Sequence, residues 1–141
     1  MKKLIFMFAS LLILASCEKE KILPTAKIPS EISNYTSTHF PEFPIIQVIK
    51  DTDGFELTYD VVLKDGYFLE FNRKKEIIDI EGVMALPNSV IPANIIEFVL
   101  ENYSNNYIIG WELDKKNQQV KLDNSIELEF DMNGNFIKID S

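Results

Sequence analysis

The clearest pattern in the chain is a two-residue alternation of apolar and polar side chains. It is strongest at positions 55–63, where every second residue is large and apolar. Because successive side chains of a β-strand point to opposite faces of a sheet, this period predicts a strand with one buried face. Apolar runs bounded by turn residues predict further strands. These lie at about 45–49, 67–72, 76–81, 107–114, 118–123 and in the two arms of 126–140.

A short turn divides the last of these segments. Alternation continues up to Phe130, an Asn-Gly pair follows, and apolar residues then return on one face. Asn-Gly favours tight hairpins because both residues accept positive φ. Residues 126–140 therefore predict a β-hairpin that places Glu127 and Glu129 together, on the face opposite Leu128 and Phe130.

Two segments follow a helical period instead. Pro29 fits the first position of a short helix over about 29–40, which ends before the next proline. Pro92 opens a second helix with an apolar stripe that predicts burial on one side. This stripe consists of Ile95, Ile96, Val99, Leu100 and Tyr103.

The order of these elements is used twice. A Leu-Pro pair, a helix, strands and a closing hairpin occur in 23–82 and again in 86–140, and roughly a third of the aligned positions are identical. One helix covers only part of a four-stranded sheet, so two such units are expected to join edges. The pattern predicts an α+β fold, with one antiparallel sheet of about eight strands and two helices on one face.

The first 27 residues have another character. Two lysines precede an apolar run that is too short for a permanent membrane span, so residues 1–16 are interpreted as an export signal. The run ends Leu-Ala-Ser-Cys, which resembles a bacterial lipobox and implies cleavage before Cys17 and lipid attachment to it. A plain secretory signal with an incidental cysteine is the alternative. We expect residues 17–27 to be the lipidated cysteine with a charged tether, and 23–141 to be the folded domain.

The charge balance narrows the class of partner. The 141 residues carry a net charge of -8, and loss of the two signal lysines leaves the mature chain at about -10. Nucleic-acid binding needs basic patches, so a nucleic-acid partner is not expected. An acidic surface suits a basic partner, although it also simply keeps a protein soluble.

Lipobox, repeated order and closing hairpin together resemble the PepSY-like family, also called β-lactamase-inhibitor-like. The most specific match is Leu-Glu-Phe-Asp-Met-Asn-Gly-Asn-Phe-Ile-Lys-Ile-Asp at 128–140. In the first copy Asn72 stands for the aspartate and Lys74-Lys75 replace Asn-Gly, so a looser hairpin is expected there. The resemblance implies a small envelope lipoprotein or secreted protein of Bacteroides- or Flavobacterium-type bacteria, acting as a binding or inhibitory module.

Few side chains suit catalysis or metal binding. The only histidine, His39, is interpreted as a capping or packing residue, and the only cysteine as a lipid attachment point. A nucleophilic triad, a zinc site and a cofactor are therefore not expected. Asp131, Asn133 and Asn135 offer oxygens at alternate positions, as a calcium loop does, but Gly134 comes too early for an EF-hand. Calcium is kept only as a weaker alternative.

Binding is then the expected role, and we do not expect an enzyme. The favoured hypothesis is a non-catalytic protein-binding or inhibitory lipoprotein at the outer membrane, with an envelope enzyme such as a peptidase as partner. The alternatives are an accessory lipoprotein for glycan or peptide and, last, an unrecognised hydrolase with a carboxylate pair in a cleft. The expected surface is the open sheet face with the loops near Asp51 and Lys115. Its candidate residues are Trp111, Tyr67, Tyr107, Glu127 and Glu129, with core packing as the alternative for the aromatic residues.

Overall fold

The computed structural model describes residues 19–140. Residues 1–16, predicted to be an export signal, and Cys17 lie outside this range, so it does not test their predicted roles. The elements in chain order are β1 (Lys21–Ile22), η1 (Thr25–Lys27), α2 (Ser30–His39), β2 (Ile45–Asp53), β3 (Glu56–Leu63), β4 (Tyr67–Phe71), β5 (Ile77–Gly82), η2 (Asn88–Val90), α3 (Ala93–Asn102), β6 (Ile108–Leu113), β7 (Asn117–Leu122), β8 (Glu127–Asp131) and β9 (Phe136–Asp140).

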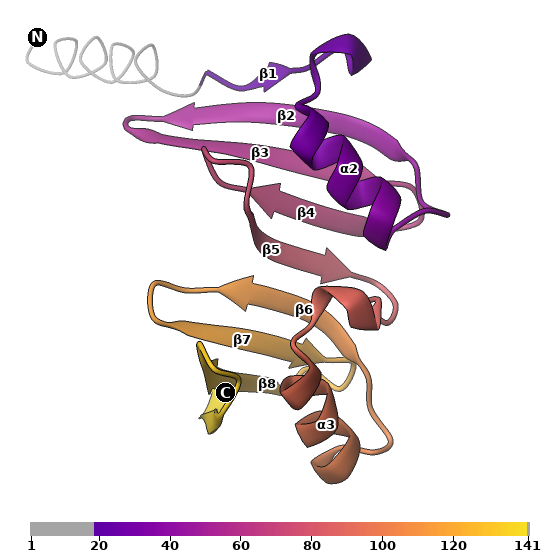
Figure 1. The fold of residues 1–141 in the computed structure, drawn as a ribbon, viewed down its shortest axis with the longest axis vertical. Coiled ribbons are helices and arrows are strands. Elements are labelled where there is room, and N and C mark those ends of the chain that lie inside the picture. The colour runs from indigo at the N-terminus through magenta and orange to yellow at the C-terminus, as the bar shows by residue number, and fades with distance from the viewer. Residues whose placement is uncertain (1–18, 141) are drawn as a thin grey trace, which may run out of the picture.

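The strands of residues 19–140 form one antiparallel sheet of nine strands whose order in space is their order in the chain. Both helices lie on the same side of this sheet (Figure 1). The predicted α+β class is therefore confirmed, with one strand more than expected. The additional strand is β1, in which Lys21 and Ile22 pair with Lys50 and Ile49. Part of the segment expected to be a tether is thus hydrogen-bonded to the sheet.

The junction between β5 and β6 joins the first half of the sheet to the second. Its chain connection includes η2 and α3, whereas the other neighbouring strands from β2 onward are joined by short hairpins. Three cross-strand pairs form the junction: Asp79 with Glu112, Ile80 with Trp111, and Glu81 with Gly110. We call this junction the seam.

The core lies between the sheet and the two helices. Phe71 of β4 and Phe130 of β8 are fully buried at corresponding places under α2 and α3. Each meets an aromatic ring of its helix edge-on, Tyr35 in one case and Phe98 in the other, with ring centroids 5.4 Å apart in both. Burial of rings of this size is a dominant contribution to the stability of a small domain.

Both helices begin directly after the proline that predicted them, at Ser30 and Ala93. The predicted apolar stripe of α3 is too wide, however. Ile95 and Val99 are buried, whereas Leu100 is 62% exposed. A ten-residue helix lying on a flat sheet buries a stripe narrower than a hemisphere, and Leu100 falls beside that stripe rather than within it.

The turns of the β4–β5 and β8–β9 hairpins have the same hydrogen-bond pattern. In the first, Asn72 N–H donates to Glu76 O at 2.9 Å, and Lys75 N–H donates to Asn72 O at 2.8 Å. In the second, Asp131 N–H donates to Asn135 O at 2.9 Å, and Gly134 N–H donates to Asp131 O at 3.0 Å. The first hairpin is therefore closed by the same backbone bonds as the second, although its sequence predicts a looser turn.

Among residues 19–140, neither helix is long and apolar enough to cross a membrane.

Candidate functional site

The face of the sheet opposite the helices carries a row of carboxylates across its centre. Asp60 of β3 lies opposite Glu70 of β4, and Glu70 lies opposite Asp79 of β5. Across the seam, Asp79 lies opposite Glu112 of β6. We call these four residues the carboxylate row. Like charges directly opposite each other on one face destabilise a sheet, so the row costs stability and needs another explanation.

Burial and repulsion by neighbouring carboxylates raise the pKa of three of these groups, Asp60, Glu70 and Asp79. The pKa of Asp79 is raised to about 7, chiefly by its partial burial and then by the charges of Glu81, Glu112 and Glu70. Burial likewise raises the pKa of Glu70, with a further contribution from Asp60. A cation placed over the row would lower the pKa of both carboxyls again, because an opposite charge within a few ångströms favours the ionised carboxylate.

Two shallow grooves flank Asp79 and Glu81 on this face. One, of about 290 Å³, is lined by residues of β3, β4 and β5, including Asp60, Glu70 and the side chain of Phe68. The other, of about 130 Å³, crosses the seam to β6, β7 and β8. Gly110 is buried in the lining of the second groove, where an added Cβ would lie 3.2 Å from Cβ of Lys121, another lining residue. The carboxylate row therefore has a shallow groove on each side of Asp79.

An apolar spot adjoins the row in the first half of the sheet. Phe68 is 50% exposed and lies opposite Val62 on one side and Glu81 on the other. An exposed aromatic ring beside carboxylates is suited to a lysine or arginine, because the aliphatic stem packs on the ring while the charged end reaches the acids.

Charges in the second half of the open face are largely paired with neighbours. Glu129 forms an ion pair with Lys138 at 3.4 Å, and Gln119 donates hydrogen bonds to Glu127 and Asp140. Within residues 19–140 this is the one ion pair between side chains. The unpaired negative charge is therefore concentrated in the first half and at the seam.

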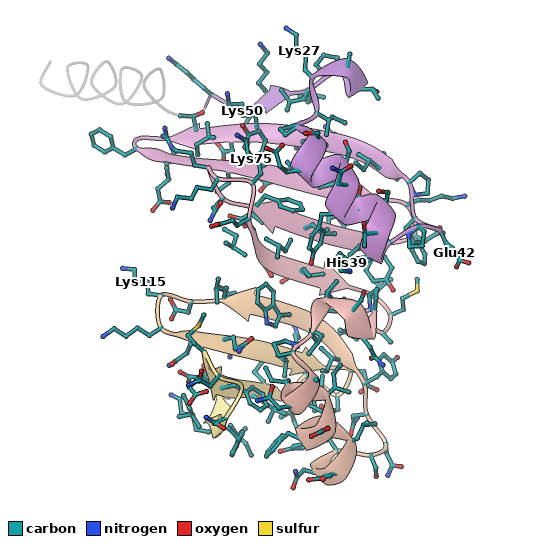
Figure 2. All side chains as sticks on the ribbon, viewed as in Figure 1. Lys27, His39, Glu42, Lys50, Lys75 and Lys115 are labelled. Carbon is teal, nitrogen blue, oxygen red and sulfur yellow. The ribbon has the colours of Figure 1, made fainter. Side chains whose placement is uncertain are left out.

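The hairpin tips add a second feature at one end of the sheet. Phe55, at the tip of the β2–β3 hairpin, is 98% exposed, and its carbonyl oxygen accepts a 3.0 Å hydrogen bond from Arg73. Lys115 projects from the tip of the β6–β7 hairpin at the same end of the sheet (Figure 2). An aromatic ring that is almost fully exposed on a hydrogen-bonded hairpin is a typical anchor for a protein partner.

Two of the predicted surface aromatics belong to the core instead. Tyr67 is 3% exposed and donates a hydrogen bond to Ala85 O at 2.7 Å. Trp111 is 8% exposed, and its indole N–H donates to Gln118 Oε1 at 2.9 Å. Strand alternation places both on the helix-covered face, and each has its polar atom satisfied there, so neither is available to a partner.

The other three candidates are accessible. Tyr107 is 47% exposed, beside the start of β6. Glu127 and Glu129 lie on the open face, as predicted, while Leu128 and Phe130 between them are completely buried. The hydrogen-bond partners given above engage both glutamates within the chain. They therefore border the candidate site rather than form its centre.

His39 and the residues of the alternative calcium loop have structural roles. His39 ends α2 on the helix side, where its Nδ1 lies 2.8 Å from Ser89 Oγ (Figure 2). Asp131 Oδ1 accepts the N–H groups of Asn133 and Asn135 within the turn, which lowers the pKa of this carboxyl. Over residues 19–140, no three His, Cys, Asp or Glu side chains converge as a metal site requires.

The carboxylate row itself was missed by the sequence reasoning. Asp60, Glu70, Asp79 and Glu112 each occupy the polar positions of their strands, which is the signal that the sequence offers. Their alignment depends on register, and the Asp79–Glu112 pair depends on which strands meet after α3. The positions of charged residues in the sequence do not show which of them lie opposite one another on neighbouring strands.

Comparison with known proteins places these features in a family. The family described as "Putative beta-lactamase-inhibitor-like, PepSY-like" matches residues 14–58 and 57–138. No curated protein matches the chain.

Solved structures from Bacteroides are similar in fold and sequence. One, from Bacteroides vulgatus, is described as a "putative periplasmic protein" of the DUF2874 family; it is 32% identical with a TM-score of 0.80, over 87% of this chain and 98% of that one. A second, from Bacteroides thetaiotaomicron, is described as a "putative calcium-regulated periplasmic protein"; it is 28% identical with a TM-score of 0.82, over 86% and 97%.

A third, also from Bacteroides vulgatus, is described as a "putative periplasmic protein of unknown function", with 28% identity and a TM-score of 0.81 over 86% of this chain and 99% of that one. These neighbours support a periplasmic or envelope location, and none of the matches indicates a catalytic family. Because the family match extends over most of the sequence, the chain belongs to the PepSY-like, β-lactamase-inhibitor-like family.

Proposed function

We propose that this protein is a non-catalytic envelope module that binds a basic segment of another protein across the open face of its sheet. The observation that carries the proposal is the carboxylate row. Four acidic side chains stand directly opposite one another at a cost to stability. Within residues 19–140 none of them forms an ion pair, although Lys121 lines the neighbouring groove. A partner that supplies lysine or arginine side chains relieves this repulsion, and the relief contributes to the free energy of binding.

Further features support a basic partner on this face. The Oδ1 atom of Asp51 is buried and, among the described residues, has no hydrogen-bond partner. The pKa of Asp60 is raised chiefly by its partial burial and then by the charge of Asp51. Phe68 offers an apolar contact beside the row, and Phe55 extends the surface at the hairpin end. Complementary charge of this kind accelerates association and selects the partner.

We further propose that the protein is a lipoprotein and that its two halves arose by duplication. Attachment of a diacylglyceryl group to the Cys17 sulfur, cleavage before this residue and acylation of the new amine would hold the domain at the outer membrane by a short tether. The matching helices, hairpins and buried rings of the two halves support duplication of one ancestral unit. If the basic partner is an envelope enzyme, occupation of its surface would inhibit it.

Calcium regulation, named for one of the neighbours, has no comparable support here. Both carboxylate oxygens of Asp131 accept hydrogen bonds within its own turn. The carboxylates of the row do not converge as a calcium site requires.

The test compares two variants that change net charge equally on opposite faces. Glu70→Lys with Glu112→Lys reverses two of the four charges of the row, whereas Glu31→Lys with Glu97→Lys reverses two exposed acids on α2 and α3. The mature, full-length chain in non-ionic detergent is titrated with a fluorescent peptide rich in lysine, and anisotropy gives the affinity. We expect the row variant to bind about tenfold more weakly and the helix variant to bind about as the parent does. Equal losses would mean non-specific attraction and would overturn the proposal, as would failure of the parent to bind.

A second measurement addresses inhibition. The parent chain and both variants are used to capture proteins from an envelope extract. A basic hydrolase that is retained by the parent and the helix variant, released by the row variant, and inactive while bound would support an inhibitory role. A captured enzyme that keeps full activity would restrict the role to binding.

A further inference from the structure

The two edges of the sheet differ in how they are protected. At the first edge, β1 covers part of β2 with only two residues, Lys21 and Ile22. At the other, β9 is a five-residue strand with no further neighbour among residues 19–140. Its apolar side chains remain accessible: Phe136 is 40%, Ile137 47% and Ile139 54% exposed. An edge strand with accessible apolar side chains and unpaired backbone groups is a template for another strand.

The sequence of β9 is complementary to itself in one antiparallel register. Lys138 and Asp140 face the open side of the sheet, opposite Glu129 and Glu127, whereas Ile139 faces the helix side, opposite Leu128. If two copies of β9 pair with Ile139 opposite Ile139, Lys138 of each copy lies opposite Asp140 of the other. Residues directly opposite in an antiparallel pair share a face, so this register makes two ion pairs and one apolar contact.

The position of α3 leaves room for this register. Phe98 of α3 stacks on Phe136 at 4.5 Å between ring centroids, so the helix covers the beginning of β9. Ile139 lies at the other end of the strand. The charge of Lys138 fits as well, because its present partner Glu129 lies on β8 and the second copy would add Asp140 on its other side.

We propose that two copies of this chain associate through β9, antiparallel and centred on Ile139, to form one continuous sheet. The contact is a short one, and so the association is weak and reversible in solution. It leaves the carboxylate row uncovered on both copies, and it does not depend on any function of that row. Both open faces would point to the same side, which doubles the acidic surface offered to a partner.

A cysteine at the symmetry axis tests the register. In an antiparallel pair, opposite Cα atoms lie about 4.5–5.5 Å apart, within the range that a disulfide bridges. Ile139→Cys in the full chain, oxidised mildly in its membrane, is expected to give a disulfide-linked dimer. Lys138→Cys is the matched control on the adjacent, equally accessible position, and it is expected to link poorly with itself but well with Asp140→Cys. The unsubstituted chain controls for any contribution of Cys17.

A charge exchange tests the same register without cysteine. Sedimentation of the detergent-solubilised chain is expected to show dimerisation weakened about tenfold by Lys138→Asp, and by Asp140→Lys, since each creates two like-charge pairs. The double variant is expected to restore it. Glu129→Gln, which removes the ion pair within the chain but not those between copies, should leave the mass unchanged. Equal linking of the Ile139→Cys and Lys138→Cys variants, or a double variant no better than the single ones, would overturn the proposal.

Discussion

The β4–β5 and β8–β9 hairpins have the same turn but tolerate different residues at its left-handed position. Lys75 occupies that position at φ 62° in the first hairpin, and Gly134 occupies it at φ 80° in the second. A Cβ added to Gly134 would overlap the amide of Asn94, which belongs to α3. Glycine at 134 therefore suits both the left-handed φ and the close approach of the Asn94 side chain, whereas the turn without such a neighbour accepts lysine at 75.

The two turns also use different side chains, an asparagine and an aspartate, as the hydrogen-bond acceptor at the same position. Asn72 Oδ1 accepts the N–H groups of Lys74 and Glu76, and Asp131 Oδ1 accepts those of Asn133 and Asn135. Either side chain provides the oxygen that the turn needs. Aspartate in the second hairpin is therefore a turn residue, and its place in the most recognisable sequence motif reflects the fold.

The largest effect is expected from the buried rings beneath the two helices. Phe71→Ala and Phe130→Ala should each lower the free energy of unfolding by about 3–5 kcal/mol, because each leaves a large cavity. Denaturant unfolding followed by circular dichroism measures the loss. If the halves unfold as one unit, both variants show a single transition. Two separate transitions would mean that the seam does not couple the halves.

A smaller effect is expected at the left-handed turn position. Gly134→Ala should destabilise by about 1–3 kcal/mol, since it combines a strained φ with displacement of Asn94. The displaced Asn94 also loses its 2.6 Å hydrogen bond to Asn133 O. Lys75→Gly is the matched control and should not destabilise, because glycine relieves strain at its positive φ. Equal losses from the two variants would contradict the role assigned to α3.

The smallest of the three effects is expected at the seam and depends on pH. The folded state holds a proton on Asp79 up to a pKa of about 7, well above the ordinary value of 3.8, so this group's stabilisation falls as pH rises from about 4 to 7. Asp79→Asn should therefore stabilise the protein at pH 7.5, by about 1–2 kcal/mol after solvent screening, and hardly at all at pH 4.

Thermal melts of the parent and the Asp79→Asn variant at the two pH values measure this difference. Asp123→Asn is a useful contrast, since hydrogen bonds from Asn106 and Tyr107 lower the pKa of that carboxyl. It should reduce stability at neutral pH and lose its effect in acid. A stabilisation by Asp79→Asn that is the same at both pH values would show that its charge is not the cause.

Much of the fold follows from local pattern. Alternation identified the strands, the prolines marked both helix starts, and Asn-Gly marked the last turn. Features that depend on distant contacts did not follow from it. The addition of β1 requires β2 to have a free edge near Lys50, and the exposure of Leu100 depends on how α3 lies on the sheet.

The candidate site was predictable in location but not in content. The open face was expected, and Glu127 and Glu129 were assigned to it correctly. Its acidic centre requires the register of four strands, including two that meet only after α3. For Tyr67 and Trp111 the alternative of core packing is correct, and the sequence left both roles open because an aromatic residue in a strand has the same local signature whether its face is covered or open.

The strand order has a consequence for how the chain reaches this structure. Strands that are neighbours in the sheet are consecutive in the sequence, so the sheet can extend one strand at a time as the polypeptide emerges. Pairings that are local in sequence form quickly because little chain entropy is lost in closing each loop. The first four-stranded unit with α2 can gather its buried rings before the second is complete, and β9 is the last strand to find its place.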